Sequence, residues 1–101
     1  MANNFKGYQS AGITTETTII TGAASTETTV VGLSVANVGA GEASVSIKVN
    51  AAYMVKDAPV QVGGSLIAVG GEQKVVLEAT DTIKVTSDVA VDVIASTLEI
   101  S

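Results

Sequence analysis

Apolar and polar residues alternate along most of this chain, and no long stretch shows the spacing of an amphipathic helix. In the run 31–36 every second residue is a large aliphatic one, with Val31, Leu33 and Val35 on one side. In the run 43–50, valine and isoleucine alternate with polar residues. Such alternation predicts half-buried β-strands. The glycine-rich segment 38–42 between the two runs predicts that they pair as a β-hairpin.

The second half of the chain repeats this pattern in shorter runs. The runs 74–78, 82–86 and 89–100 alternate, and turn-forming residues separate them. The last run begins with valines at odd positions and ends with Ile94, Leu98 and Ile100 at even positions. Because a strand changes side only at an inserted residue, this predicts a bulge near 95–97, or a strand buried on both faces.

Turn signals are frequent elsewhere, at Pro59 and at the glycine pairs 63–64 and 70–71. The similar segments 14–20 and 25–31 predict two further strands with a short connection. Seven or eight short strands predict an all-β domain, a single antiparallel β-sandwich of jelly-roll or immunoglobulin-like type. We expect an N-terminal arm at residues 1–10 and the sandwich at residues 11–101, since 101 residues suffice for one domain.

The composition removes most side chains that carry chemistry. The chain has no histidine, cysteine, tryptophan or arginine, and its three aromatic residues are Phe5, Tyr8 and Tyr53. A core of valine, isoleucine, leucine and alanine gives a thin margin of stability at this size. We therefore expect the protein to gain stability by associating with its own copies or with another protein.

The charge pattern excludes some partners. Ten acidic residues and five lysines give a net charge of −5, which makes direct nucleic-acid binding unfavourable. The chain has no membrane-length apolar run, so we expect no membrane partner. Its first ten residues contain no apolar segment typical of a secretory signal, so assembly in a cytoplasm is expected.

Few residues are candidates for catalysis. Ser46 and Lys48 share one strand face, and the carboxylates Asp81, Asp88 and Asp92 lie in or near C-terminal turns. Neighbours on a solvated strand and acids in turns are ordinary surface features. The chain has no complete phosphate-binding loop, dinucleotide fingerprint or calcium loop. We therefore expect no enzyme activity, catalytic residue, cofactor or metal.

The candidate interaction residues are aromatic or small. Phe5 and Tyr8 could anchor the arm in a neighbour's groove, or fold back over the chain's own sheet. Tyr53 could contact a carbohydrate. A face of small residues would let another protein layer approach closely, or would simply face solvent. The residues of this face are Gly32, Ser34, Ala36, Ser44 and Ser46.

Residues 29–100 resemble small β-sandwich virion proteins of tailed bacteriophages. The likeness rests on the order of several motifs, each weak alone. They are VGLSVAN at 31–37, YMVKDAPV at 53–60, GGEQKVVLE at 70–78, DTIKV at 81–85 and the closing run 93–100. At Thr80 the family pattern often has glycine, so the turn before Asp81 departs from it.

The resemblance implies an all-β component of a virion, with no catalytic residue to carry over. We expect a capsid decoration or cement protein that binds the major capsid protein, other virion proteins or its own copies. A neck, collar or tail accessory protein is the alternative. A receptor-binding or carbohydrate-binding module is the second alternative, although the scarcity of aromatic residues disfavours it.

Overall fold

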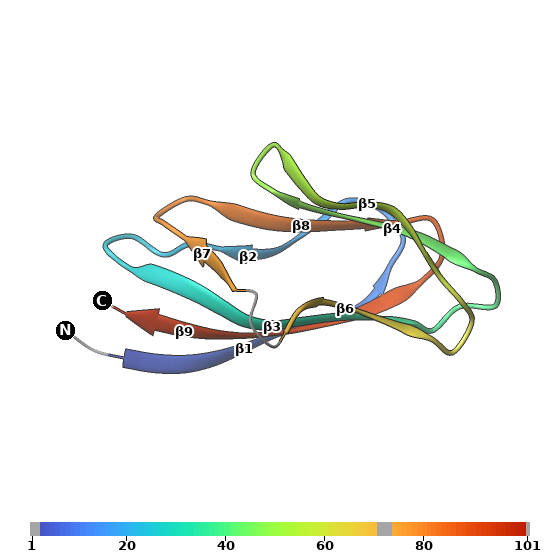
Figure 1. Cartoon of the computed structure of the whole chain (residues 1–101), viewed down its shortest axis with the longest axis horizontal. Coiled ribbons are helices and arrows are strands. Elements are labelled where there is room, and N and C mark those ends of the chain that lie inside the picture. The colour runs from blue at the N-terminus through green and yellow to red at the C-terminus, as the bar shows by residue number, and fades with distance from the viewer. Residues whose placement is uncertain (1–2, 71–73, 101) are drawn as a thin grey trace.

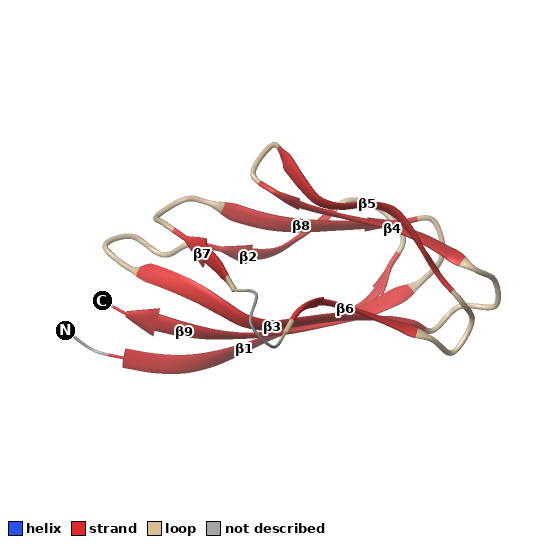
Figure 2. Ribbon diagram, in the orientation of Figure 1, coloured by secondary structure: helices blue, strands red, loops and turns tan. Residues whose placement is uncertain are grey.

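Two antiparallel sheets pack face to face in this computed structural model, which describes residues 3–70 and 74–100 (Figure 1; Figure 2). This confirms the expected all-β sandwich, with nine strands in the described residues where seven or eight were expected. No helix there is long and apolar enough to cross a membrane. The strands are β1 (Asn3–Ile13), β2 (Thr17–Thr21), β3 (Glu27–Asn37), β4 (Ala43–Val49), β5 (Ala52–Val60), β6 (Ser65–Val69), β7 (Val75–Leu77), β8 (Thr82–Ser87) and β9 (Val91–Ile100).

Most consecutive strands belong to opposite sheets. One sheet has the order β1-β9-β3-β6, with β7 also pairing with β3, and the other has the order β2-β8-β4-β5. The predicted hairpin between the runs 31–36 and 43–50 is therefore wrong, because β3 and β4 lie in different sheets. Both strands direct one side to the same core, and alternation alone does not distinguish facing strands from paired ones. The segments 14–20 and 25–31 likewise contribute strands to opposite sheets, β2 and β3.

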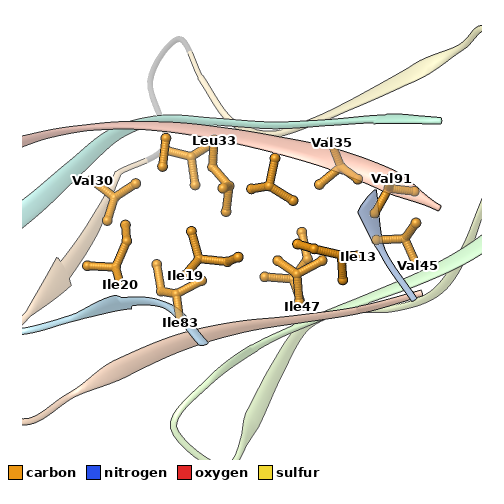
Figure 3. Packing of buried hydrophobic residues seen from close by; sticks show 14 of the residues in the cluster. Ile13, Ile19, Ile20, Val30, Leu33, Val35, Val45, Ile47, Ile83 and Val91 are labelled. Atoms are coloured by element: carbon orange, nitrogen blue, oxygen red, sulfur yellow. The ribbon is translucent and has the colours of Figure 1, made fainter. Parts of the chain in front are cut away.

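The core lies between the sheets and is almost entirely aliphatic. Inward side chains from both layers interdigitate, among them Val30, Leu33 and Val35 of β3 against Ile47 of β4 and Ile83 of β8 (Figure 3). These five side chains are at most 1% exposed. Burying a side chain of this size contributes about 1.5–3 kcal/mol, so the paired layers are the main source of stability.

The bulge predicted near residues 95–97 of β9 lies instead on β3, the strand that pairs with β9. In β9 the odd positions stay buried from Val91 to Thr97 without a break. On β3, Val30 pairs with Thr97 and Gly32 with Ser96, so the extra residue is Val31. Val30 and Leu33 are both buried, whereas Val31 between them is half-buried, so the expected two-residue alternation from Val31 is interrupted. The bulge lets β3 keep its buried side against a regular β9.

The expected N-terminal arm is a strand of the sheet. Described residues 3–10 pair with β9 from Asn3↔Ile100 to Ser10↔Val93, and β1 continues to Ile13 after a register shift. The boundary expected after residue 10 therefore falls inside a strand. Because β1 pairs only with β9, it forms one edge of the five-stranded sheet.

Candidate interaction surface

The outer face of the five-stranded sheet presents a row across four strands in which three of the four side chains are apolar. The register pairs Phe5 of β1 with Leu98 of β9, Leu98 with Thr29 of β3, and Thr29 with Val76 of β7. Directly paired residues of antiparallel strands point to the same side of a sheet. Phe5 is 81% exposed and Val76 is 57% exposed, so this row faces away from the core.

A second row crosses the same face four residues earlier in β9. It joins Gln9 of β1, Ile94 of β9, Ser34 of β3 and Ile67 of β6. Ile67 is 65% exposed and Ile94 is 56% exposed. Only small outward residues separate the two rows along β1 and β9, namely Gly7 and Ser96, with Gly32 and the bulged Val31 beside them on β3. We call the two rows and these four residues the apolar outer face.

The apolar outer face carries no charged side chain among its described positions. Charges begin one position beyond each row, at Glu27 next to Ile100 and at Asp92 next to Ala36. An exposed apolar surface bordered by polar residues is typical of contact with another protein. Gly32 and Ser34 have small side chains, so a second layer could approach the backbone of β3 closely.

The five small residues predicted to share one face are divided between the two outer faces. Gly32, Ser34 and Ala36 point outward from β3 in the five-stranded sheet, whereas Ser44 and Ser46 point outward from β4 in the other sheet. The prediction of one small-residue face is therefore wrong. It followed from the expected hairpin, which would have placed the two strands side by side.

The two N-terminal aromatic residues point to opposite sides of β1. Phe5 belongs to the apolar outer face, whereas Tyr8 pairs with Ala95 on the side of the core. The Tyr8 hydroxyl donates a hydrogen bond to Glu99 Oε2 at 2.6 Å, and Lys6 Nζ lies 5.2 Å from the ring centre. Burial, and then this hydrogen bond and the charge of Glu99, raise the pKa of Tyr8 to about 12. Of these two aromatic rings, Phe5 is the one free to meet a partner.

The carboxylates considered for catalysis hold backbone groups in place. Asp88 Oδ1 accepts a hydrogen bond from the Ser44 N–H at 2.8 Å, and Asp92 Oδ1 accepts one from the Gly12 N–H at 2.9 Å. Asp81 Oδ2 accepts the Glu78 N–H at 3.0 Å, and this bond, together with one from Asn50, lowers the pKa of Asp81. Asp81 therefore stabilises its own turn, whereas Asp88 and Asp92 tie residues 88–92 to β4 and β1.

The remaining chemical candidates are also separated. Ser46 Oγ donates a hydrogen bond to Asp57 Oδ1 at 3.3 Å and accepts one from the Asp57 N–H, whereas Lys48 lies over the Tyr53 ring. The structure therefore records no contact between Ser46 and Lys48. Within residues 3–70 and 74–100, no group of three histidine, cysteine or acidic residues could hold a metal ion.

Comparison with known proteins gives a likeness of fold. No protein-family model matches the chain, and no curated protein is similar to it in sequence. Among solved structures, the chain resembles a subunit of Bacillus endospore appendages, described as a novel family of disulfide-linked pili. The TM-score is 0.52 at 14% identity, over 99% of this chain and 87% of that one. At this identity the likeness concerns the β-sandwich fold alone.

Proposed function

We propose that the protein is a non-catalytic structural subunit of a tailed-bacteriophage virion, and that it decorates the capsid by binding the shell through its apolar outer face. The single observation that carries this proposal is that face, where Phe5, Ile67 and Ile94 are all more than half exposed. The chain has a net charge of −5, but this face has no charged side chain. Another protein layer can therefore bind there without removing any charged group of this chain from water.

The sequence resemblance to phage virion proteins supports the choice of a virion as the assembly to which this protein binds. A neck, collar or tail accessory protein would use the same face, because all of these positions require docking on a larger assembly. The contact chemistry therefore does not distinguish these locations on the particle, and microscopy is needed to tell them apart.

The second candidate function is the subunit of a filamentous appendage. The observation that favours it is the likeness of fold to the endospore appendage subunit, which covers nearly the whole chain. That protein is described as disulfide-linked, whereas the present chain contains no cysteine. Copies of this chain would have to join through non-covalent surfaces.

A carbohydrate-binding role is less well supported. Sugar rings stack on open aromatic faces, and Tyr53 is 52% exposed on the outer side of the four-stranded sheet. However, the ammonium groups of Lys48 and Lys56 lie 5.3 Å and 5.1 Å from the centre of its ring. These cations occupy the ring surface that a sugar would need.

The test is electron microscopy of particles assembled with and without this gene product, combined with substitutions on the face. We expect Phe5→Ser and Ile67→Ser to reduce occupancy on the particle by about tenfold or more, because each removes roughly 1.5–3 kcal/mol of apolar burial. Val38→Ser is the matched control, since Val38 is 54% exposed and lies outside the apolar outer face.

Thermal unfolding of each variant checks that the sandwich is intact. Loss of density over the shell when the gene product is missing supports decoration, and loss of a ring at the vertex supports the neck alternative. Filaments grown from the purified chain alone favour the appendage. Particles of unchanged appearance, or full occupancy with both face variants, would overturn the proposal.

A further inference from the structure

Three of the five lysines lie with Tyr53 on the outer side of the four-stranded sheet. The register pairs Lys84 of β8 with Lys48 of β4, and Lys48 with Tyr53 of β5, so these residues form one row. The Nζ atoms of Lys48 and Lys56 lie 5.3 Å and 5.1 Å from the centre of the Tyr53 ring. We call these four residues the lysine–tyrosine cluster.

Irregular pairing in the edge strand β5 builds the cluster. Val55 pairs with Ile47 and packs against the core, and a regular two-residue period would place Tyr53 on that same side. The register instead shifts between Ile47 and Lys48, so Tyr53 pairs with Lys48 on the outer side. A second shift lies next to Lys56, where Asp57 has a φ of 51°. Both irregularities lie beside members of the cluster.

The cluster has no carboxylate partner within the described part of the chain. The structure records no ion pair for Lys48, Lys56 or Lys84 there. Asp57 follows Lys56 in β5, but its carboxylate accepts the hydroxyl of Ser46. Like charges placed directly opposite each other across two strands repel. An anionic group over the Lys48–Lys84 pair would therefore relieve a repulsion that the fold itself creates.

Carboxylates dominate one end of the sandwich. The loops 14–16, 38–42, 61–64 and 88–90 all lie at the end of the sandwich away from Asn3 and Ile100, at the right of Figure 1. They hold Glu16, Glu42 and Asp88, and Asp92 follows at the start of β9, with no lysine among them. These four charges account for −4 of the net −5, which leaves −1 for the rest of the chain. We call these four residues the acidic pole.

We propose that the lysine–tyrosine cluster of one copy binds the acidic pole of a second copy of this chain. The inference rests on the proposed structural function and names a partner for a second surface, distinct from the apolar outer face. Charge complementarity selects the occupant, because each copy carries both a lysine group without carboxylate partners and a lysine-free group of carboxylates. Asp88 and Asp92 are held in place by backbone N–H groups, so part of the pole is preorganised.

Two different surfaces of the molecule meet in this contact. A contact of this kind repeats from copy to copy and forms an open series, unlike a closed two-fold dimer. Exposed charges interact over a Debye length of about 10 Å at 0.1 M salt. The association therefore weakens steeply as salt is added, whereas docking through the apolar outer face does not.

Sedimentation velocity of the full chain tests the proposal. We expect concentration-dependent association at about 20 mM NaCl that is lost at about 0.5 M NaCl, where the screening length falls to a few ångströms. Lys48→Glu/Lys84→Glu and Glu16→Lys/Glu42→Lys should each weaken association by about tenfold or more. The first variant makes the contact repulsive, and the second cancels the net charge of the acidic pole. Glu16 and Glu42 are exposed, and no recorded hydrogen bond depends on either side chain.

The decisive experiment is to mix the two charge-reversed variants. In the mixture the unaltered lysine–tyrosine cluster of one variant meets the unaltered acidic pole of the other, so association should return although neither variant associates alone. Lys6→Glu is the matched control for a single Lys48→Glu, because it makes the same change of charge outside the cluster. A wild-type chain that stays monomeric at low salt would overturn the proposal, as would a mixture without recovery.

Further measurements distinguish binding to a second copy from binding to another polyanion, and distinguish this inference from the proposed function. Association that needs added single-stranded DNA would overturn the proposal in favour of a polyanion site. A wild-type chain that stays monomeric at low salt but occupies particles through Phe5 would reject this inference and keep the virion role. Salt-sensitive association with no protein on any particle would keep this inference and reject the virion role.

Discussion

Asn37 Nδ2 donates a hydrogen bond to the carbonyl oxygen of Val60, 2.9 Å away, and so joins the end of β3 to the end of β5 in the opposite sheet. The same amide also donates to the Gly41 carbonyl oxygen at 2.8 Å, and its Oδ1 accepts the Gly39 N–H at 2.9 Å. Asn37 is 4% exposed. One buried side chain therefore closes the crossing loop 38–42 against both sheets.

We predict that Asn37→Ala lowers the free energy of unfolding by about 2–4 kcal/mol, because it leaves buried backbone groups without partners. Chemical denaturation of both proteins measures the difference. Asn4→Ala is the control, since Asn4 is exposed on β1 with no recorded side-chain hydrogen bond. A loss below about 0.5 kcal/mol for Asn37→Ala would show that the loop is held by other contacts.

Gly22 docks the β2–β3 connection onto the β7–β8 turn. Its N–H donates to the Asp81 carbonyl oxygen at 2.8 Å, and its carbonyl oxygen accepts the Thr80 N–H at 3.0 Å. A Cβ at this position would collide with the carbonyl oxygen of Glu78, a backbone atom that cannot rotate away. The close approach of the two segments therefore requires glycine.

We predict that Gly22→Ala costs about 1–3 kcal/mol of stability, through displacement of one segment from the other. Gly41→Ala is the matched control, because a Cβ at Gly41 would meet nothing within 4 Å. Thermal unfolding of the two variants should separate them clearly. Equal melting temperatures would mean that the turn yields without cost.

Tyr8 makes the stability of the sandwich sensitive to alkaline pH. Its pKa is raised from 10.0 to about 12, so the folded state favours the neutral phenol. The contribution of Tyr8 to stability is therefore complete below pH 10.0 and is lost as pH rises towards about 12. We predict that Tyr8→Phe unfolds with a shallower dependence on pH in this window.

Equilibrium unfolding at several pH values between 9 and 12, roughly spanning the titration, measures this slope. Tyr53→Phe controls for the general loss of a phenol, because no carboxylate accepts a hydrogen bond from Tyr53 in the described structure. Parallel profiles for wild type and Tyr8→Phe would contradict the prediction.

The fold class could be predicted from the sequence because alternation reports directly which residues face a core. Alternation does not report which strands pair. For this reason β3 and β4 were expected side by side, although the Asn37 network sends the chain across to the other sheet. Residues 1–10 were expected as an arm because Phe5 and Tyr8 lie in a polar stretch before the first clear alternating run. Of these, residues 3–10 are described by the structure. They form a strand because the backbone of β9 offers a free edge.

The interaction surface could be predicted only in part. Phe5, Gly32 and Ser34 were already candidates from the sequence, and the structure places all three on the apolar outer face. Ile67 and Ile94 were not candidates, because an aliphatic residue in a strand is ordinarily assigned to the core. The row from Lys84 through Lys48 to Tyr53 depends on the pairing of three strands and on a bulge. The spacing of residues along the chain does not show which strands pair, so it could not predict this row.

The pairing of Asn3 with Ile100 has a mechanical consequence. A force that pulls these two positions apart would break the hydrogen bonds between β1 and β9 one after another, in the unzipping geometry. Such a geometry opens at low force, whereas sliding two strands past each other would strain all their bonds at once. A particle that used this protein as a clamp would have to transmit tension through its broad faces, away from its chain ends.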